Sequence, residues 1–481
     1  MSQTYDIAII GAGVTGVLTA RELSRYALRV ALLERRNDVA TGTTKANSAI
    51  VHAGFDAPVG SLKAKLNVQG TAMMPGLCET LHVPYKNTGS LVLAFDAQDR
   101  EMLDELKVRG EQNGVPGLKI LEGAEIQAME PNANPDCTGA LYAPTAGIVS
   151  PYELAIAGAE CAVANGVEFY REFAVNNIDK TDEGFVCHAA DGREVKAKVV
   201  INAAGVHADK IANLIGDESF AITPCKGEYL LLDQSQGDIV NTVVFQCPSA
   251  MGKGILISPT VHGNVIIGPN AQNLEDRDDL TTTDSALNEV WTAAGRSFPG
   301  YRIRDVITSF AGLRARCDRH DFVLEPSAVD SHFINAGGIE SPGLSAAPAI
   351  AQMLAELAKQ AWNGEMTLKE NWNPGRAKPM LVKELAAAEY AALVKEQPEY
   401  GRIICRCETI SEGEIIHAIH APAGARDTDG IKRRTRSGMG RCQGGFCGTK
   451  LIEILSRELN IPMEDVTKHG GASQILVSKT K

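Results

Sequence analysis

The stretch Tyr5–Gly16, YDIAIIGAGVTG, decides the fold of the first part of the chain. An apolar strand pattern over residues 5–10 runs into three glycines at G-x-G-x-x-G spacing, and a helical pattern follows. Glycines at this spacing let the backbone at a helix N-terminus approach a pyrophosphate closely. A second strand pattern, Arg29–Leu33, ends at Glu34, whose carboxylate can accept hydrogen bonds from a ribose hydroxyl. We therefore predict a βαβ unit that binds a dinucleotide, because a turn that only packs a helix on a sheet would not explain Glu34.

Elements of the same kind return much later in the chain. We expect helices over 151–165 and 346–363, and strands over 167–170, 199–201 and 333–335. The last two strands run into small-residue turns, one at Gly205 and one in Ala336–Gly343, AGGIESPG. A nicotinamide enzyme usually completes its site within one contiguous domain, so this dispersed arrangement favours a flavin dinucleotide.

The segments between these elements have other patterns. The small-residue stretch Thr41–Ala57 predicts a functional loop. Alternating apolar residues over about 71–110 and 224–316 predict strands of a mostly antiparallel sheet. Residues 371–379 indicate a linker and residues 380–395 a helix.

Composition and charge exclude several classes of protein. The formal net charge of −12 argues against a nucleic-acid-binding surface, which normally carries a basic excess on one face. We interpret the one basic cluster, Lys432, Arg433, Arg434 and Arg436, as a solvated loop, with a docking patch for an acidic partner as the alternative. No apolar run approaches the roughly 20 residues of a membrane span, and the N-terminus leaves no room for a signal peptide. We expect a cytoplasmic protein.

Four of the 11 cysteines are clustered near the C-terminus. Cys405 and Cys407 form one close pair, and Cys442 and Cys447 form another within the glycine-rich run GMGRCQGGFCG. Four thiolates are the ligand set of a [2Fe–2S] cluster, and neighbouring glycines free backbone N–H groups to bond its sulfurs. A four-cysteine zinc site is the competing interpretation, although C-x-C is an unusual zinc half-site. The other seven cysteines have no ligand spacing, and we expect buried thiols.

Two parts of the chain resemble known families. The chain resembles the D-amino-acid-oxidase superfamily of FAD oxidoreductases in five stretches, which are Gly11–Gly16, Glu34–Arg35, Ser48–Gly54, the turn at Gly205 and Ala336–Gly343. Over residues 5–362 the chain resembles, more narrowly, anaerobic glycerol-3-phosphate dehydrogenases and related L-2-hydroxyglutarate dehydrogenases. Residues 402–458 resemble bacterioferritin-associated-ferredoxin-like [2Fe–2S] domains, and the final C-x₄-C spacing matches the variant fused to multi-subunit dehydrogenases rather than the C-x₂-C of the small ferredoxins.

The resemblance implies FAD as the cofactor and assigns residues to it. The positions that match the family's FAD-binding motifs are Gly11, Ala12, Gly13, Val14, Thr15, Gly16, Glu34, Arg35, Thr43, Thr44, Asn47, Ser48, Val175, Ala204, Gly205, Gly312, Gly338, Ile339, Gly343 and Leu344. The helix after Gly343 would direct its positive end towards the flavin and stabilise its anionic reduced form.

Oxidation of a secondary alcohol needs a hydride acceptor, a base for the hydroxyl proton and cations for an anionic substrate. By resemblance His52 is the base, while a packing role or covalent attachment to FAD are its alternatives. Lys253 and Arg314 would hold the anion, and Arg316 is an alternative to Arg314. The alternative role of these basic residues is ion pairing with acidic residues on the surface. Ser48 and Ser341 are further candidates for substrate binding.

The resemblance implies an FAD-dependent dehydrogenase of a small anionic hydroxy-acid or polyol-phosphate substrate, most directly sn-glycerol 3-phosphate. L-2-hydroxyglutarate and amino or imino acids are alternative substrates, and an iron–sulfur carrier with purely structural FAD is an alternative of another class. Electrons would leave through the cluster to a second flavoprotein, another electron-transfer subunit or a quinone, with peripheral membrane association through a partner.

We therefore predict a mixed α/β and α+β fold, in which a Rossmann-like FAD-binding domain is interleaved with an antiparallel-sheet substrate domain and followed by a small helical [2Fe–2S] domain. The expected FAD-binding domain comprises residues 1–75, 145–222 and 317–365, and the substrate domain comprises 76–144 and 223–316. A linker and helix over 366–400 lead to the [2Fe–2S] domain over 401–481.

Overall fold

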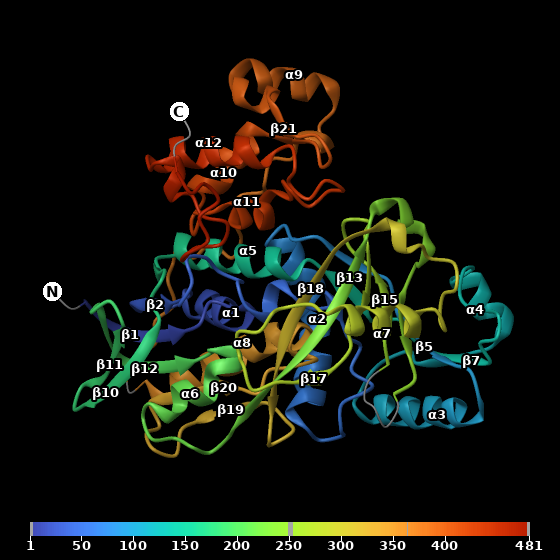
Figure 1. Cartoon of the computed structure of the whole chain (residues 1–481). Helices are drawn as coiled ribbons and strands as arrows, with labels where there is room; N and C mark the ends of the chain where they lie inside the picture. Colours follow the sequence, from blue (N-terminus) through green and yellow to red (C-terminus); the bar gives the residue numbers. More distant parts are fainter. Residues whose placement is uncertain (1–2, 249–253, 363, 479–481) are drawn as a thin grey trace.

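A computed structural model of the chain describes residues 3–248, 254–362 and 364–478. Two large sheets lie side by side, and a small C-terminal module sits above the first of them (Figure 1). This arrangement confirms the predicted fold class.

The first sheet has a parallel centre in the order β20-β12-β1-β2-β9. An antiparallel hairpin extends it, because β11 pairs with the first half of β12 while β20 pairs with the second half. The strands are β1 (Gln3–Ile10), β2 (Val30–Leu33), β9 (Glu168–Tyr170), β10 (Val175–Thr181), β11 (Gly184–Ala189), β12 (Glu194–Asn202), β19 (Val323–Pro326) and β20 (Phe333–Gly337).

Alternation along β1 distributes its side chains between two cores. Ile7 and Ile9 pack under the helices on one face, whereas Ala8 and Ile10 face the hairpin side. The helices that share the first core are α1 (Val14–Leu23), α2 (Leu62–Thr80), α5 (Pro151–Ala164) and α8 (Gly343–Ala361), and α6 (Ala208–Asn213) covers the opposite face.

The second sheet is antiparallel except where β14 pairs with β5. It contains β5 (Ser90–Ala94), β6 (Lys119–Leu121), β7 (Gly139–Ala143), β13 (Ile222–Leu232), β14 (Val243–Gln246), β15 (Leu256–Pro259), β16 (Val265–Gly268), β17 (Gln272–Asn273) and β18 (Val306–Cys317). Helices α4 (Gly123–Met129) and α7 (Asp284–Ala294) cover one face, and α3 (Ala97–Gln112) covers the other. A small third sheet joins β3 (Ile50–Val51), β4 (Tyr85–Asn87) and β8 (Gly147–Val149).

The prediction of strands over residues 71–110 is largely wrong. Helices α2 and α3 occupy most of that segment, and only β4 and β5 are strands. The apolar residues of α2 face α8 in the first core, so its pattern reflects helix–helix packing rather than a sheet face. The helix expected over 380–395 is a short 3₁₀ turn followed by α9 (Ala387–Glu396).

The C-terminal module has its own apolar core. Helices α10 (Glu412–His420), α11 (Thr428–Thr435) and α12 (Gly448–Leu459) enclose Ile415, Ile431 and Leu455 beside the hairpin of β21 (Ile403–Cys405) and β22 (Ile410–Ser411). The seven cysteines outside this module are buried thiols, as predicted. Among the described residues no helix is both long and apolar enough to cross a membrane.

The interpretation of the basic cluster as a solvated loop is wrong. These residues lie on or just after α11, and Arg433 and Arg434 both bind the fully buried carboxylate of Asp38, which follows β2. Arg436 is also buried and donates to Glu408 within the module. Burial alone would raise the pKa of Asp38, but the charges and hydrogen bonds of Arg434 and Arg433 outweigh it and hold that pKa well below its usual range. Arg433 and Arg434 of the basic cluster therefore anchor the module to the first domain, where α11 lies above α5 (Figure 1).

Candidate functional site

A cavity of about 1140 Å³ lies between the first and second sheets. Its walls come from the βα turn after β1, the loop after β2, the end of β12, strands β13 and β18, and the segment before α8. Because parallel strands bring their carboxyl ends to one edge, these distant segments meet there.

The glycines of the first turn have different tasks. Gly11 has a φ of +106°, and a Cβ there would lie 2.4 Å from the Ala203 carbonyl oxygen of β12's turn. A Cβ on Gly16 would lie 1.9 Å from the Gly11 oxygen, so Gly16 serves helix–strand packing. Gly13 faces the cavity, and a Cβ there would meet only Thr44 Oγ1. The turn thus leaves open backbone at the N-terminus of α1, as a pyrophosphate requires.

Glu34 ends β2 at the cavity wall and is almost fully buried. Its Oε2 accepts from the Ala12 N–H at 2.8 Å, and its Oε1 accepts from the Arg36 N–H at 2.9 Å. Burial raises the pKa of Glu34, and these two backbone bonds oppose the rise. The carboxylate is held rigidly where a ribose can donate to it.

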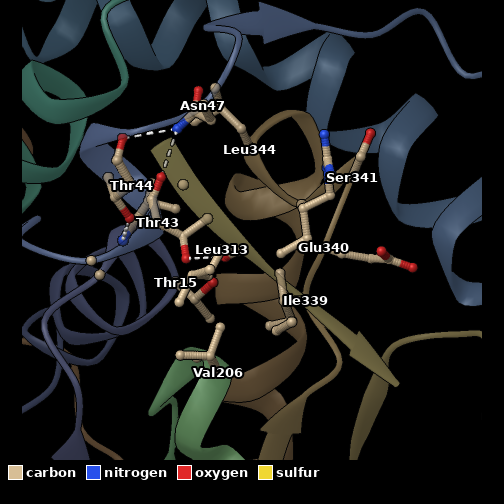
Figure 2. A pocket seen from close by; sticks show the side chains of 18 of the residues that line it. Thr15, Thr43, Thr44, Asn47, Val206, Leu313, Ile339, Glu340, Ser341 and Leu344 are labelled. Carbon is tan, nitrogen blue, oxygen red and sulfur yellow. Dashed lines mark hydrogen bonds between the residues drawn. The ribbon is translucent and has the colours of Figure 1, made fainter. Parts of the chain in front are cut away.

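The loop after β2 closes the cavity through one hydrogen bond to β18 and one to the start of α1 (Figure 2). Thr43 Oγ1 donates to the Leu313 carbonyl at 2.6 Å, and Thr44 Oγ1 accepts from the Val14 N–H at 3.0 Å. Asn47 Nδ2 donates to the carbonyls of Thr43 and Thr44, which fixes the turn between them. This loop contacts the neighbouring strand so closely that a Cβ on Gly312 would lie 1.9 Å from the Ala46 oxygen.

Most residues predicted to bind FAD line this one cavity. Those on its wall are Gly11, Gly13, Val14, Thr15, Glu34, Arg35, Thr43, Thr44, Asn47, Ser48, Val175, Ala204, Gly205, Gly312, Ile339, Gly343 and Leu344. Ala12, Gly16 and Gly338 do not line it. Gly338, with a φ of +66°, lies against Cys317, where a Cβ would come within 2.8 Å of that side chain.

The predicted base stands at the end of the cavity away from Glu34's turn. His52 directly follows β3, its ring stacks on Phe245 of β14 with centroids 5.7 Å apart, and its Nε2 lies 3.5 Å from Ser341 Oγ. Ser48 is on the same loop and donates to the hydroxyl of Tyr229 at 3.4 Å. His52, Ser341 and Ser48 therefore share one pocket.

Arg314 reaches this pocket from β18. Its guanidinium donates to the Asn270 carbonyl at 3.1 Å and contacts Cys225 Sγ at 3.5 Å, and it forms no ion pair within the described residues. A Cβ on Gly227 would lie 2.7 Å from Arg314 Nη2, so that glycine makes room for the side chain. Arg316, two residues on, donates to Asn273 and lies 3.9 Å from Glu340. Among the described residues Arg314 thus has neutral partners but no carboxylate partner, whereas Arg316 lies near the Glu340 carboxylate.

Lys253, the other predicted cation, lies outside the described residues.

Several lining residues have no counterpart in the sequence prediction. Tyr229 stacks on Phe310 at 4.7 Å and bonds Ser48, and Lys63 on α2 forms a buried 2.9 Å ion pair with Glu340. This pair ties the N-terminus of α2 to the segment that carries Ile339 and Ser341. Its partners are 277 residues apart, so no local pattern identifies it.

The four clustered cysteines form two pairs. Cys407 and Cys442 have their sulfurs 3.6 Å apart, and Cys447 hydrogen-bonds Cys405 and lowers its pKa. Among the described residues no three His, Cys, Asp or Glu side chains are grouped to hold a single metal ion. Two cysteines for each of two irons is the division that a [2Fe–2S] cluster needs.

The surroundings of the cysteines fit such a cluster. Backbone N–H groups of Phe446, Gly444 and Gly445 face the Cys442 sulfur. The hydroxyl of Ser437 is fully buried beside Cys405 and Cys447 and has no hydrogen-bond partner of normal length among the described residues. Donors aimed at sulfur stabilise a cluster's negative charge.

Comparisons with known proteins agree with both sites. The family model for FAD dependent oxidoreductases matches residues 6–357, and that for the BFD-like [2Fe-2S] binding domain matches residues 403–457. A glycerol 3-phosphate dehydrogenase of Caloramator mitchellensis is 49% identical over 99% of both chains. A glycerol 3-phosphate oxidase of Mycoplasma genitalium is 32% identical, over 77% of this chain and 98% of its own.

A solved structure gives the same answer. The L-α-glycerophosphate oxidase of Mycoplasma pneumoniae, solved with FAD bound, superposes with a TM-score of 0.75 at 32% identity and covers 79% of this chain and 100% of its own. The cofactors of this chain are thus FAD and a [2Fe–2S] cluster. Residues around Gly13, Glu34 and Thr44 fit the first, and the two cysteine pairs fit the second.

Proposed function

We propose that this chain, which belongs to the FAD dependent oxidoreductase family, oxidises sn-glycerol 3-phosphate to dihydroxyacetone phosphate. The observation that carries the proposal is the match over nearly the whole length of both chains to a glycerol 3-phosphate dehydrogenase, at 49% identity. The match spans the C-terminal module as well as the segments that line the flavin cavity.

The pocket beside His52 supplies what this reaction needs from the protein. FAD, when bound, accepts the hydride from the alcohol carbon. His52 Nε2 takes the hydroxyl proton, and Ser341, 3.5 Å away, orients the same substrate oxygen. Arg314 binds the phosphate, because its guanidinium has no acidic partner of its own among the described residues and can pair with two phosphate oxygens. Lys253 is proposed as a second cation at this end.

The C-terminal module favours electron export over reaction with oxygen. The oxidase structure covers its own chain fully yet only 79% of this one, so this chain carries an additional segment large enough to include the module. A [2Fe–2S] cluster takes one electron at a time and cannot accept a hydride, so it lies downstream of the flavin. We propose that the cluster passes electrons to a separate electron-transfer protein or subunit, and that any attachment to a membrane runs through such a partner.

We propose that the cavity divides the flavin part of the chain into two functional domains. The FAD-binding domain comprises residues 1–75, 145–222 and 317–365, and the substrate domain comprises residues 76–144 and 223–316. Its first boundary falls within α2, which packs in the FAD-binding core as far as Cys78.

The proposal is tested by anaerobic bleaching of the bound flavin. Glycerol 3-phosphate, L-2-hydroxyglutarate, proline and glycine are added in turn, and absorbance near the flavin maximum is followed in a stopped-flow instrument. We expect fast bleaching by glycerol 3-phosphate alone, because Arg314 and the proposed Lys253 site suit a phosphate dianion. Faster bleaching by L-2-hydroxyglutarate or by an amino acid would reject glycerol 3-phosphate as the substrate.

A further inference from the structure

The two cysteine pairs differ in their access to solvent. Cys405 and Cys447 are buried, whereas Cys407 is exposed and Cys442 is half-buried. A cluster held by these pairs has an inner iron within the module and an outer iron near its surface. Electron transfer falls steeply with distance, so the outer pair is the exit.

The inner pair lies on the side of the module that is anchored to the flavin domains. Ser437 lies beside Cys405 and Cys447, and it comes two residues after the end of α11. Helix α11 carries Arg433 and Arg434, which bind Asp38 of the first domain. The described contacts therefore place the inner pair towards Asp38 of the first domain, and the outer pair is the one that solvent reaches.

A large aromatic ring stands free beside the outer pair. Phe446 lies in the loop between Cys442 and Cys447 and is 86% exposed. Its backbone N–H is turned towards the Cys442 sulfur, so the main chain that carries the ring lies next to the outer pair. Exposed phenylalanine is typical of the apolar centre of a protein–protein contact.

Exposed basic residues lie close in sequence to the four cysteines. Arg406, between Cys405 and Cys407, is exposed and forms no ion pair within the described residues. Lys450 is 58% exposed and pairs with Glu453 one helical turn away, whereas Arg441, 65% exposed, lies 3.3 Å from Asp233 just after β13 and so contacts the flavin domains. In a chain of net charge −12, Arg406 is an exposed cation beside the outer pair with no acidic partner among the described residues. It would attract an acidic partner that the rest of the surface repels.

We propose that Cys407, Phe446, Arg406 and Lys450 form an acceptor face, and that its occupant is an acidic one-electron carrier protein with an apolar centre to its own contact. The inference rests on the proposed function, since it needs a cluster that exports electrons. Each encounter moves one electron from the reduced cluster to the carrier, so the cluster is oxidised and the carrier reduced with no bond made or broken. Two encounters complete one substrate oxidation.

The test measures reoxidation of the cluster directly. Full-length holoenzyme is reduced with stoichiometric dithionite and mixed with an acidic plastocyanin or, as the basic counterpart, with cytochrome c. We expect Arg406→Glu with Lys450→Glu to slow electron transfer to plastocyanin by about tenfold or more at low ionic strength. The difference should vanish near 1 M salt, where charges are screened within about 3 Å. Transfer to cytochrome c should become faster in the same variant.

Phe446→Ala should slow transfer to plastocyanin at every salt concentration, because it removes the contact rather than the steering. The matched control is Lys119→Glu with Lys196→Glu, two exposed lysines on β6 and β12 that give the same change in net charge. We expect less than about a twofold effect from it. Equal rates in the acceptor-face variants and the control would overturn the proposal.

A sedimentation assay with phosphatidylglycerol vesicles separates a protein partner from a membrane surface. If wild type bound the vesicles and Arg406→Glu with Lys450→Glu did not, the face would be a membrane contact and the proposal would be wrong. Because dithionite supplies the electrons, none of these rates depends on glycerol 3-phosphate. Failure of the proposed substrate would appear only as absent bleaching in the earlier assay.

Discussion

Replacing Asp38 by Asn should release the C-terminal module from the flavin domains. Asp38 has no exposed surface and accepts three hydrogen bonds from guanidinium groups, at 2.5 Å from Arg433 and twice at 2.7 Å from Arg434. An amide of the same shape removes the negative charge and leaves two arginines, 5% and 3% exposed, without the carboxylate that binds both of them directly. Breaking a buried pair in this way costs about 3–5 kcal/mol.

The loss should appear as undocking rather than as global unfolding, because the module keeps its own apolar core. The remaining described links are mainly polar, namely Asn37 to Asp427, Arg171 to the Gly424 carbonyl, Arg436 to Asn264 and Arg441 to Asp233. At about 1.4 kcal/mol per tenfold, a loss of about 3–5 kcal/mol lowers the docking equilibrium constant by roughly 10²- to 4 × 10³-fold. FAD and iron content should remain those of wild type.

Three measurements check this expectation. Limited proteolysis should cut residues 364–380 faster, small-angle scattering should show a larger radius, and the reduced-cluster signal should lag behind flavin bleaching by substrate. The matched control is Glu325→Gln, which breaks an exposed pair with Arg319 and should cost at most about 1 kcal/mol. If Asp38→Asn resisted protease as wild type does and its cluster were reduced without a lag, the anchor would lie elsewhere.

The same pair predicts how docking depends on pH. The folded pKa of Asp38 is depressed below its ordinary value of 3.8, so its contribution is fully present above that value. It is lost as the pH falls below about 4 towards the folded pKa. Wild type should therefore undock progressively in acid, whereas Asp38→Asn should show little of this dependence.

Three further predictions concern the redox sites. Arg314→Ala should raise the apparent KM for glycerol 3-phosphate by about 10- to 100-fold with FAD retained, because a hydrogen bond to a charged group contributes about 1.5–3 kcal/mol. The control Arg316→Ala should change that KM less than about threefold. Equal effects of the two variants in steady-state assays would contradict the assignment of Arg314. His52→Gln should slow anaerobic bleaching by about 10²- to 10⁴-fold while dithionite still reduces the flavin, and bleaching at the wild-type rate would exclude His52 as the base. Cys442→Ser should leave bleaching intact but abolish the cluster's paramagnetic signal and turnover with plastocyanin, and an unchanged iron content of about two per chain would show that Cys442 is not a ligand.

Local patterns predicted the parts of the molecule that local physics determines. The glycine spacing after β1 and the carboxylate at Glu34 are enforced by backbone geometry within one βαβ unit, so the sequence identifies them directly. The set of four cysteines was likewise visible, because two of them on each side are near in sequence, but the structure pairs Cys407 with Cys442 and Cys405 with Cys447, across the two motifs. The family resemblance added the distant segments, such as Gly312 and Ile339, that periodicity could not assign to this cavity.

The errors came from features that depend on distant partners. Arg434 looked like a solvated residue because its counterion, Asp38, is 396 positions away. The helix α2 was mistaken for part of a sheet because its apolar residues pack on α8, which comes nearly 300 residues later. Lys63 and Glu340 were missed for the same reason. An ion pair formed only in the folded chain leaves no periodic signal in either segment.

The loop after β2 connects the two redox sites. Thr43 and Thr44 of this loop line the flavin cavity. Asp38, which comes earlier in the same loop, binds the arginines of the module. Burial and the nearby positive charge of Arg433 lower the pKa of Lys45, so the end of the loop also lies against α11. A chain of this fold without the module would expose Asp38 to water, where it needs no arginine partner. Relatives of this fold that carry the iron–sulfur module should therefore also have an acidic residue after β2 and arginines on α11. Relatives that carry the module but lack both residues would argue that docking, and with it rapid transfer from flavin to cluster, is achieved by another contact.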